Sequence, residues 1–380
     1  MQKHFLTIAK ILMSKFKETV LEIDLKAVTH NFKVLKSRLQ AKTKILAVVK
    51  AFAYGSDAQE IAKHLQHLDV DYFAVAYVKE GIALREAGIT KPILVLHCQP
   101  INFDLIIEHC LEPSLYSKRI LNEFIRVAET HQQKNYPVHI KFNTGLNRLG
   151  FAQTDITTIV DTLKTTSAIT ITSIFSHLAA SEDHKENAFS KRQIESFDTI
   201  CSELLKLLSY KPFLHLCNTS GILNFPEAHY DMVRSGIGIY GFGNDPVFNT
   251  LFQPISTLKT CISQIHSLKK GDSLGYNRAF FAEIDTKTAT LPIGHADGIH
   301  RSLGKGKGFV TINNQSAPII GNVCMDMIMV DITDINCEEG DEVIIFDKTH
   351  SVINLAKKAE SISYELITSI SQRVKRTFKR

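Results

Sequence analysis

The sequence lacks the cysteine patterns that bind zinc or build a disulfide framework. It has seven cysteines, an odd number, and no two of them are spaced as Cys-x-x-Cys or at another zinc-like interval. Structural disulfides form in oxidising compartments, and most zinc sites use closely spaced cysteines. We therefore expect a cytoplasmic protein with reduced thiols and no metal site.

Long hydrophobic runs are also absent. No stretch is long enough to span a bilayer, and the short apolar run at residues 5–9 is broken by Lys10 and followed by no small-residue cleavage site. We expect neither secretion nor a membrane partner. A recognisable folding pattern starts at Glu18, so residues 1–17 are expected to be an N-terminal extension whose first dozen residues, up to Met13, are dispensable.

Charge of one sign is scarce as well. The chain has 44 basic and 39 acidic residues, a net charge of +5, and the excess is scattered except at residues 373–380. A modest, dispersed excess argues against a nucleic-acid partner. The composition, 44% apolar and 22% charged, is that of an ordinary globular protein, and 380 residues suggest two domains.

The first two thirds of the chain alternate between buried strands and amphipathic helices. Residues 45–49 are an uninterrupted apolar run, and residues 56–67 and 79–87 have helical periods. Seven further strands are predicted at 71–77, 92–97, 113–116, 137–142, 171–177, 213–217 and 231–234. Eight strand–helix units of this length predict an α/β fold, a (β/α)8 TIM-type barrel over residues 18–250.

The pattern changes after residue 243. Short alternating runs at 258–265, 288–293, 308–312, 317–320, 327–332 and 342–346 are separated by glycine-containing turns. We expect a mostly β C-terminal domain over residues 251–380, closed by a helical stretch around residues 354–370. No repeat, linker or low-complexity tract marks the boundary.

Lys50 ends the first apolar strand of the predicted barrel. A lysine packed in apolar surroundings has a lowered pKa, and the neutral amine is then a nucleophile of the kind that forms a Schiff base. Tyr54 and Gly55, a phenol and a turn glycine, follow in positions suited to holding a phosphate. The alternative is a lysine that only leaves the sheet for solvent, which is the usual role of a lone lysine at a strand end.

Other polar residues follow the predicted barrel strands, where the chemistry of this fold is found. They are Lys141 and Arg148 after strand five, His177 after strand six, Asn218–Gly221 after strand seven and Arg234–Gly238 after strand eight. Alone, His177 would more often be a structural imidazole, and Arg148 a solvated loop cation. The hydroxyls and glycines of the last two strands suit a phosphate, which together with Lys50 points to pyridoxal phosphate.

At these residues the chain resembles the alanine racemase family, from about residue 18 to 378. The motifs that carry the resemblance are 47–55, 141–150, 176–179, 215–221, 233–241, 274–277, 292–301, 321–326 and Tyr364-Glu365. It implies a pyridoxal-phosphate barrel and a C-terminal β domain, assembled as a homodimer in which the β domain completes the partner subunit's active site. It also implies the interconversion of L-alanine and D-alanine, which supplies D-alanine for peptidoglycan.

The resemblance assigns two catalytic bases. Lys50 binds the cofactor covalently and then acts as a base on one face of the substrate Cα, and Tyr276, from the partner subunit, acts on the opposite face. A phenol has an ordinary pKa near 10, so cationic neighbours must activate it. His177 helps through an arginine network. Without the resemblance, Tyr276 would be only a packed aromatic residue at a β turn.

The resemblance also assigns binding roles. Arg234 faces the pyridine nitrogen, where it donates a hydrogen bond and leaves that nitrogen unprotonated. Arg148 and Met325 contact the substrate carboxylate, and Lys141 matches a lysine that is often carbamylated in the family. Residues that match or surround the phosphate contacts are Tyr54, Asn218, Thr219, Gly236, Ile237 and Tyr364.

Four positions depart from the family pattern. Phe52 stands where asparagine is usual, Asn143 where aspartate is common, Asn322 where arginine is common, and His295 where tyrosine is normal. His295 leaves substrate breadth open, because that tyrosine lines the substrate entrance.

Three alternatives follow from these residues. A broad-specificity racemase of the same family is the nearest, because of His295. A decarboxylase with the same architecture is disfavoured, since its chemistry needs an acidic partner at the pyridine nitrogen, where Arg234 stands. A non-catalytic pyridoxal-phosphate-binding barrel is of a different class and would lack the C-terminal motifs at 274–276 and 324–326.

Overall fold

The computed structural model describes residues 18–380, which form two compact units. One unit comprises residues 27–253, and the other combines residues 18–26 with residues 254–380. We describe each unit by itself and call them the barrel unit and the β unit. The N-terminal extension expected at residues 1–17 lies outside the described residues.

The barrel unit is built on a sheet of eight parallel strands in the order β8-β7-β6-β5-β4-β3-β2-β9. Backbone hydrogen bonds from Asp231 to Leu214 and from Arg234 to Cys217 link the two end strands, so the barrel is nearly closed. The predicted barrel is therefore confirmed. Its strands are β2 (Lys44–Val48), β3 (Tyr72–Val75), β4 (Ile93–Val95), β5 (Glu112–Leu115), β6 (Tyr136–Lys141), β7 (Ile169–Phe175), β8 (Phe213–His215) and β9 (Met232–Ser235).

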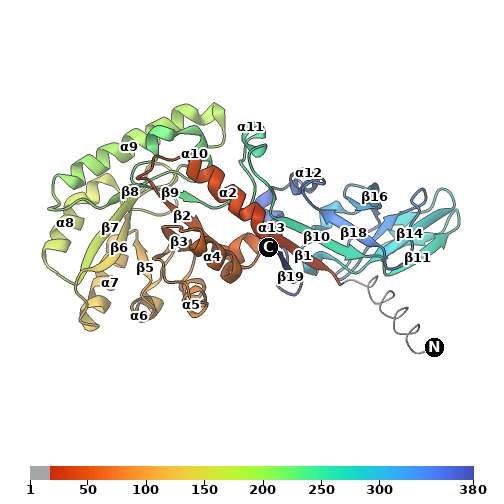
Figure 1. Cartoon of the computed structure of the whole chain (residues 1–380), viewed down its shortest axis with the longest axis horizontal. Coiled ribbons are helices and arrows are strands. Elements are labelled where there is room, and N and C mark those ends of the chain that lie inside the picture. Colours follow the sequence, from red (N-terminus) through yellow and green to blue (C-terminus); the bar gives the residue numbers. More distant parts are fainter. Residues whose placement is uncertain (1–17) are drawn as a thin grey trace. The chain divides into compact units, whose positions relative to one another are not determined.

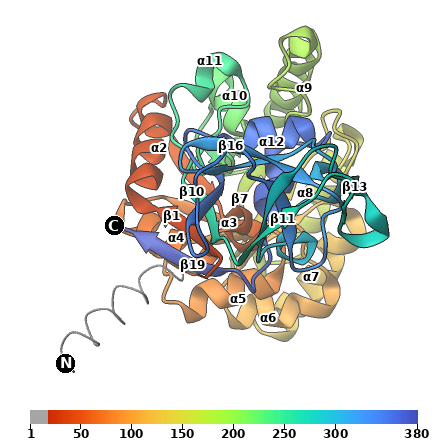
Figure 2. The same ribbon diagram turned by 90° about the vertical axis from the view of Figure 1, so that its right-hand side faces the viewer.

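Amphipathic helices follow the strands and surround them (Figure 1; Figure 2). In α4 (Ala58–His67), Asp57 caps the first turn and Ile61, Ala62 and Leu65 are buried, so the sequence period decides which face packs inward. The other helices are α2 (Leu25–Ser37), α5 (Val78–Glu86), α6 (Phe103–Glu108), α7 (Lys118–Thr130), α8 (Ile156–Lys164), α9 (Asn187–Leu205), α10 (Thr219–Asn224) and α11 (Pro246–Asn249). The short segment α3 (Lys50–Gly55) has left-handed backbone angles instead of helical ones. In residues 18–380 no helix has the length and apolar character needed to cross a membrane.

The buried part of the barrel has an apolar side and a polar side. One cluster, contributed by strands β2, β3, β4 and β9, is made of Leu46, Val48, Tyr72, Ala74, Leu94 and Met232. Strands β5 to β9 instead contribute buried polar residues that are hydrogen-bonded to one another: Glu112, His139, Ser173, His215 and Arg234. This asymmetry directs the polar chemistry to one part of the barrel.

The β unit contains a nine-stranded sheet in the order β11-β14-β17-β16-β15-β18-β10-β1-β19 (Figure 1). Its strands are β1 (Val20–Asp24), β10 (Ser256–Cys261), β11 (Gln264–Leu268), β14 (Thr286–Leu291), β15 (Phe309–Ile312), β16 (Gln315–Ile320), β17 (Ile328–Asp331), β18 (Glu342–Phe346) and β19 (Lys375–Lys379). A hairpin of β12 (Ser273–Leu274) and β13 (Phe280–Phe281) and the helices α12 (Val352–Lys358) and α13 (Ser363–Thr368) complete it. The expected mostly β domain is confirmed.

Strand β1 belongs to the β unit, which differs from the expectation that the barrel starts at residue 18. Val20 pairs with Lys259 of β10 and with Lys375 of β19, so the first described strand lies between the strand that follows the barrel and the last strand. Glu22 forms ion pairs with Lys259 and Lys379, which fix this register electrostatically. The grouping depends on contacts between residues more than 230 positions apart, which local sequence patterns do not encode.

Candidate active site

Lys50 lies directly after β2, at the start of an unusual turn. The next four residues, Ala51, Phe52, Ala53 and Tyr54, all have left-handed backbone angles, with φ between 52° and 54°. This conformation costs L-residues about 1–2 kcal/mol each, so the surrounding structure must impose it. The turn brings Lys50 and Tyr54 to the same end of the barrel.

The carboxylate of Glu80 holds this left-handed turn in place. Its Oε1 accepts a hydrogen bond from the N–H of Ala51 (2.6 Å), and its Oε2 accepts from the N–H groups of Ala76 (2.7 Å) and Tyr77 (3.0 Å) at the start of α5. Charge-assisted bonds of this kind are about twice as strong as neutral ones. Glu80 thus ties the residue after Lys50 to the cap of the next helix.

Basic groups outnumber acidic ones around Lys50. Burial and then the charge of Arg148 lower the pKa of Lys50, and only Glu80 opposes this shift. Burial also lowers the pKa of Lys141 to about 8, helped by Arg148, Arg234 and Lys50. A cluster of cations without matching carboxylates, two of which, Lys141 and Arg234, are buried, favours an anionic ligand.

The loop after β6 presents Arg148 to this cluster. Asn143 organises the loop, since its Oδ1 accepts from the N–H of Gly145 (3.1 Å) and of Asn147 (2.9 Å). Gly150 has φ +135°, and a Cβ there would lie 2.5 Å from the backbone of Asn143, so glycine is required. An aspartate at position 143 could accept the same two hydrogen bonds. The asparagine found here therefore preserves the contacts that organise the loop.

Arg234, on β9, is almost fully buried and is held from two sides. Its NH2 group donates to the carbonyl oxygens of Ser176 (2.6 Å) and Leu216 (2.9 Å) and to Nδ1 of His177 (3.1 Å), and its NH1 group donates to Nδ1 of His215 (2.8 Å). Among residues 18–380 its Nε–H has no acceptor, so one donor of the guanidinium is left for a ligand.

His177 is neutral at this place. Burial lowers its pKa well below the usual range, and the charges of Arg234, Arg148, Lys141 and Lys50 lower it further. Arginine can only donate, so Nδ1 of the ring accepts from Arg234 and carries no proton. The structure thus connects His177 to Arg234, a contact of the kind that the family resemblance implies, and fixes its tautomer.

Tyr54, Thr219 and the glycines after β9 lie against one another. A Cβ on Gly236 would lie 2.2 Å from the Tyr54 hydroxyl oxygen, and one on Gly238 would lie 2.7 Å from the Thr219 methyl carbon, so both glycines permit close approach. Within the described chain, the N–H of Ile237 donates to no acceptor, although the residue is only 2% exposed. A buried unpaired N–H beside two hydroxyl groups suits a phosphate oxygen.

Asn218 has a structural contact in addition to its expected place near the phosphate. Its Oδ1 accepts from the N–H of Gly221 (2.9 Å), which caps α10, and from the hydroxyl of Ser181 (2.8 Å). These residues, from Lys50 to Ile237, are brought together in one unit, and we call them the barrel half-site: Lys50, Tyr54, Lys141, Arg148, His177, Asn218, Thr219, Arg234, Gly236 and Ile237.

Tyr276 lies in the β unit, between β12 and β13, and is 75% exposed. Its carbonyl oxygen accepts a hydrogen bond from Nδ2 of Asn322 (3.0 Å), which joins the tyrosine segment to the segment that carries Met325. In residues 18–380 the phenol itself has no hydrogen-bond partner. Asn322, which stands where the family commonly has arginine, therefore helps to position the Tyr276 segment through this hydrogen bond.

Met325 and His295 lie on two loops that are bound to each other. The N–H of His295 donates to the Cys324 carbonyl (2.9 Å), and the N–H of Ala296 donates to the Met325 carbonyl (3.0 Å). Both side chains are exposed, Met325 by 60%. We call Tyr276, His295, Asn322 and Met325 the β half-site.

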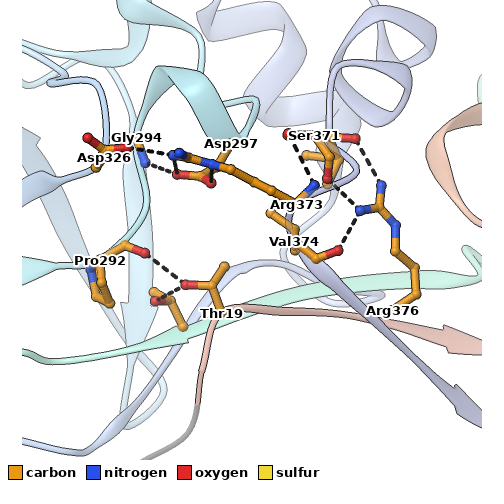
Figure 3. Close-up of polar contacts among 11 residues, drawn as sticks. Thr19, Pro292, Gly294, Asp297, Asp326, Ser371, Arg373, Val374 and Arg376 are labelled. Carbon is orange, nitrogen blue, oxygen red and sulfur yellow. Dashed lines mark hydrogen bonds and ion pairs between the residues drawn. The ribbon is translucent and has the colours of Figure 1, made fainter.

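Arg373 clamps these two loops (Figure 3). Its guanidinium makes a bidentate pair with Asp297 (2.7 and 3.0 Å) and a further bond to Asp326 (2.7 Å). Asp297 Oδ2 also accepts from the N–H of Gly294 (2.8 Å). The two carboxylates raise the pKa of Arg373 further above its usual range, so the clamp is permanently charged.

Tyr364 lies on α13 of the β unit and is half-buried, whereas the other predicted phosphate contacts belong to the barrel unit. Three residues that shape the site were absent from the sequence predictions: Glu80, His215 and Arg373. A glutamate in the first turn of a predicted helix, as Glu80 is in the predicted helix 79–87, is a capping signal, but it does not identify Ala51 as a partner.

A nearly closed parallel barrel with a lysine in a cationic mouth, and a mostly β unit in the same chain, define a class of two-domain barrel proteins with a lysine-centred anion site. Two family models cover this architecture. The alanine racemase N-terminal domain matches residues 23–244, and the alanine racemase C-terminal domain matches residues 255–378. The chain therefore belongs to the alanine racemase family, whose members are isomerases.

Full-length relatives agree with this assignment. The chain is 37% identical to an alanine racemase of Thermodesulfovibrio yellowstonii, over 96% of this chain and 98% of that protein. It is 35% identical to an alanine racemase of Treponema denticola, with coverage of 94% and 97%. Among solved structures, the alanine racemase of Clostridium difficile 630 has a TM-score of 0.90 at 32% identity, with 96% of each chain covered.

Proposed function

We propose that the chain racemises alanine with pyridoxal phosphate as cofactor, using Lys50 and Tyr276 as bases on opposite faces of the substrate Cα. The observation that carries this proposal is the half-buried Lys50, with its lowered pKa, in a mouth with an excess of cations. The cofactor, when bound, supplies a carbonyl group for covalent attachment and a ring that withdraws electrons from Cα. D-alanine for peptidoglycan is the product that the family resemblance implies.

Lys50 would attach the cofactor and then hold the proton removed from Cα. Its lowered pKa keeps the neutral amine accessible, and Glu80 fixes the backbone from which the side chain extends. The phosphate would lie against the Tyr54 and Thr219 hydroxyls and the Ile237 N–H, with Tyr364 as a further contact in the family's arrangement.

Arg234 would donate its Nε–H to the pyridine nitrogen. Its NH1 and NH2 groups are already engaged by protein acceptors, and a guanidinium cannot give up a proton to the ring. The ring nitrogen then stays unprotonated, which favours return of the proton to Cα over transamination. Arg148, at the loop after β6, would bind the substrate carboxylate.

Tyr276 would come from the partner subunit of a homodimer, with Met325 beside the substrate carboxylate. Support for this lies in the exposure of both side chains and in a phenol without a partner among the described residues. The dimer and the shared active sites are part of the proposal.

Lys141 would be carbamylated. Its pKa of about 8 leaves a substantial neutral fraction near neutral pH, and the neutral amine is the form that reacts with carbon dioxide. The resulting carbamate would place a negative charge among Arg148, Arg234 and Lys50. Mass spectrometry of the native protein and 13C NMR after exposure to labelled bicarbonate would detect the modification.

The decisive experiment follows purified protein with L-alanine for D-alanine, pyruvate and carbon dioxide. We expect D-alanine as the main product, an absorbance of the bound cofactor in the visible region, and loss of both with Lys50→Ala. Full activity of Lys50→Ala would refute the proposal, and carbon dioxide release would favour a decarboxylase.

His295 supports a second candidate, a broad-specificity racemase. Its ring is exposed on the β half-site where the family usually has a larger tyrosine. Racemisation of larger amino acids at rates near that of alanine would favour this candidate, and restoring selectivity with His295→Tyr would assign it to this residue. The non-catalytic barrel protein is disfavoured, because the chain carries the C-terminal domain that such proteins lack.

A further inference from the structure

A chain of buried polar side chains runs from Glu112 on β5 to Arg234 on β9. Oε2 of Glu112 lies 2.7 Å from Nε2 of His139, and Nδ1 of His139 lies 2.6 Å from the Ser173 hydroxyl. That hydroxyl lies 2.7 Å from Nε2 of His215, whose Nδ1 is 2.8 Å from NH1 of Arg234. Each of these five residues is buried, on five neighbouring strands.

The two ends of the chain fix its direction. Arginine can only donate, so Nδ1 of His215 accepts and its proton is on Nε2, which donates to Ser173. An ionised carboxylate can only accept, so Nε2 of His139 carries a proton and donates to Glu112. Burial and the charge of Arg234 lower the pKa of His215 well below the usual range, in agreement with a neutral ring.

Ser173 connects the two halves of the chain. Its oxygen accepts from His215, and its single proton can satisfy Nδ1 of His139, so every polar atom is paired if His139 is neutral. If His139 were doubly protonated, both His139 and His215 would donate to the Ser173 oxygen. The hydroxyl proton of Ser173 would then have no acceptor among the described residues. Complete pairing therefore favours four hydrogen bonds that all point from Arg234 toward Glu112.

Arg234 needs such support because it is a buried cation without a carboxylate in contact. In the described part of the chain no ion pair involves Arg234, although a buried charge is normally paired. Its position is fixed by neutral acceptors, of which two, Nδ1 of His177 and Nδ1 of His215, belong to side chains that could present either a lone pair or a proton. A proton on Nδ1 of His215 would repel the guanidinium and leave NH1 with only its bond to the His215 carbonyl oxygen (3.2 Å).

We infer that Glu112, His139 and Ser173 are positioning residues, which hold His215 in the tautomer that fixes Arg234 and leaves its Nε–H directed to the ligand. Within residues 18–380, no side-chain hydrogen bond or ion pair joins any of the three to a barrel half-site residue other than through this chain. The inference deepens the proposed function, because it rests on the role proposed for Arg234 at the pyridine nitrogen.

Histidine tautomers give a direct test without the cofactor. Two-bond 15N–1H NMR of 15N-histidine-labelled protein, assigned with His139→Gln and His215→Gln, reports which ring nitrogen is protonated. We expect both rings to be neutral with the proton on Nε2. A proton on Nδ1 of either ring would overturn the inference.

Variants of Ser173 test the consequence for the reaction. Ser173→Ala removes the connecting hydroxyl, and we expect kcat to fall about tenfold with KM for alanine nearly unchanged, as for other lost supporting hydrogen bonds. Without that acceptor the Nε2–H tautomer of His215 should be less strongly favoured, although Arg234 still opposes a proton on Nδ1. Ser173→Thr retains a hydroxyl and should restore most of kcat and the single tautomer.

Ser114→Ala is the matched control. Ser114 is a buried serine on β5 opposite His139 in register, and its hydroxyl has no hydrogen-bond partner within residues 18–380. This variant should match the wild type, and a Ser173→Ala enzyme that also does so would contradict the inference. The experiments distinguish a failure of this inference from a failure of the proposed function. An active alanine racemase with other histidine tautomers would contradict only the inference. A protein with the expected tautomers that does not racemise alanine would contradict only the proposed function.

Discussion

The barrel half-site and the β half-site are organised in opposite ways. In the barrel, Arg234 and His177 are buried and hydrogen-bonded, and Glu80 fixes the turn after Lys50. In the β unit, Tyr276 and Met325 project outward, and only their backbones are held. The comparison teaches that the barrel is prearranged for a ligand of its own, whereas the β unit presents side chains to something outside itself.

Subunit complementation would test this comparison with the largest effect. Lys50→Ala and Tyr276→Phe should each lower kcat by about 10³-fold or more, since each removes a base that transfers the proton. If the half-sites of different subunits combine, dimers mixed from both variants contain one intact site. Random mixing should then restore about a quarter of wild-type activity.

The control is to mix each variant with itself, which should restore nothing. Absence of recovery in verified mixed dimers would show that both bases come from the same chain, and the proposed division between partner subunits would fail.

The sequence was sufficient for the part of the site that follows strand ends. Lys50, Lys141, His177 and Arg234 were predicted because parallel strands place their carboxyl ends together. Features that depend on distant or strained backbone were not predictable from local patterns. The left-handed turn contains no glycine before residue 55, so the residue types at 51–54 do not predict it.

The same limit explains the fold details that were missed. Strand β1 pairs with strands more than 230 residues away, and the chain from Glu112 to Arg234 spans 122 positions. His139 and Ser173 look like ordinary strand residues until the barrel register sets them opposite each other. Burial in the folded state, rather than residue type, gives them their role.

Glu80 offers the next largest effect and tests prearrangement in the barrel. Glu80→Ala removes the acceptor for the N–H of Ala51 and for two N–H groups of the α5 cap. We expect kcat to fall about 100-fold, because small displacements of a catalytic group have effects of that size. The free energy of unfolding should fall by about 1–3 kcal/mol.

Glu80→Gln retains an acceptor oxygen and should keep more activity than Glu80→Ala. Glu86→Ala, an exposed change on the same helix, is the matched control and should be silent. Equal activity of Glu80→Ala and Glu86→Ala would show that the turn does not depend on this carboxylate.

Arg373 tests whether the β half-site also depends on a scaffold. Arg373→Ala removes the clamp between the loops that carry His295 and Met325 (Figure 3). We expect KM for alanine to rise about tenfold with a smaller loss of kcat, because the loops contribute substrate contacts rather than a base. Steady-state kinetics in both directions would measure this.

Arg373→Lys should recover little, since an ammonium cannot form the bidentate pair with Asp297. Lys375→Ala is the control, an exposed cation two residues away. A KM increase in Lys375→Ala of the same size would mean that general charge, rather than the clamp, matters.

Substitution of Lys141 should give the smallest effect. It measures how much the positive charge of the barrel half-site lowers the free energy of unfolding. With the folded pKa lowered to about 8 from 10.5, a protonated Lys141 destabilises the fold fully below pH 8. Between pH 8 and 10.5 the folded protein has released a proton that the unfolded chain keeps, so stability rises with pH.

In cofactor-free protein and carbon-dioxide-free buffer, Lys141→Met should raise the free energy of unfolding at pH 7 by about 1–3 kcal/mol. This gain should vanish by about pH 10, measured by urea unfolding beside the exposed control Lys134→Met. A gain independent of pH would point to packing rather than to the charge of the half-site.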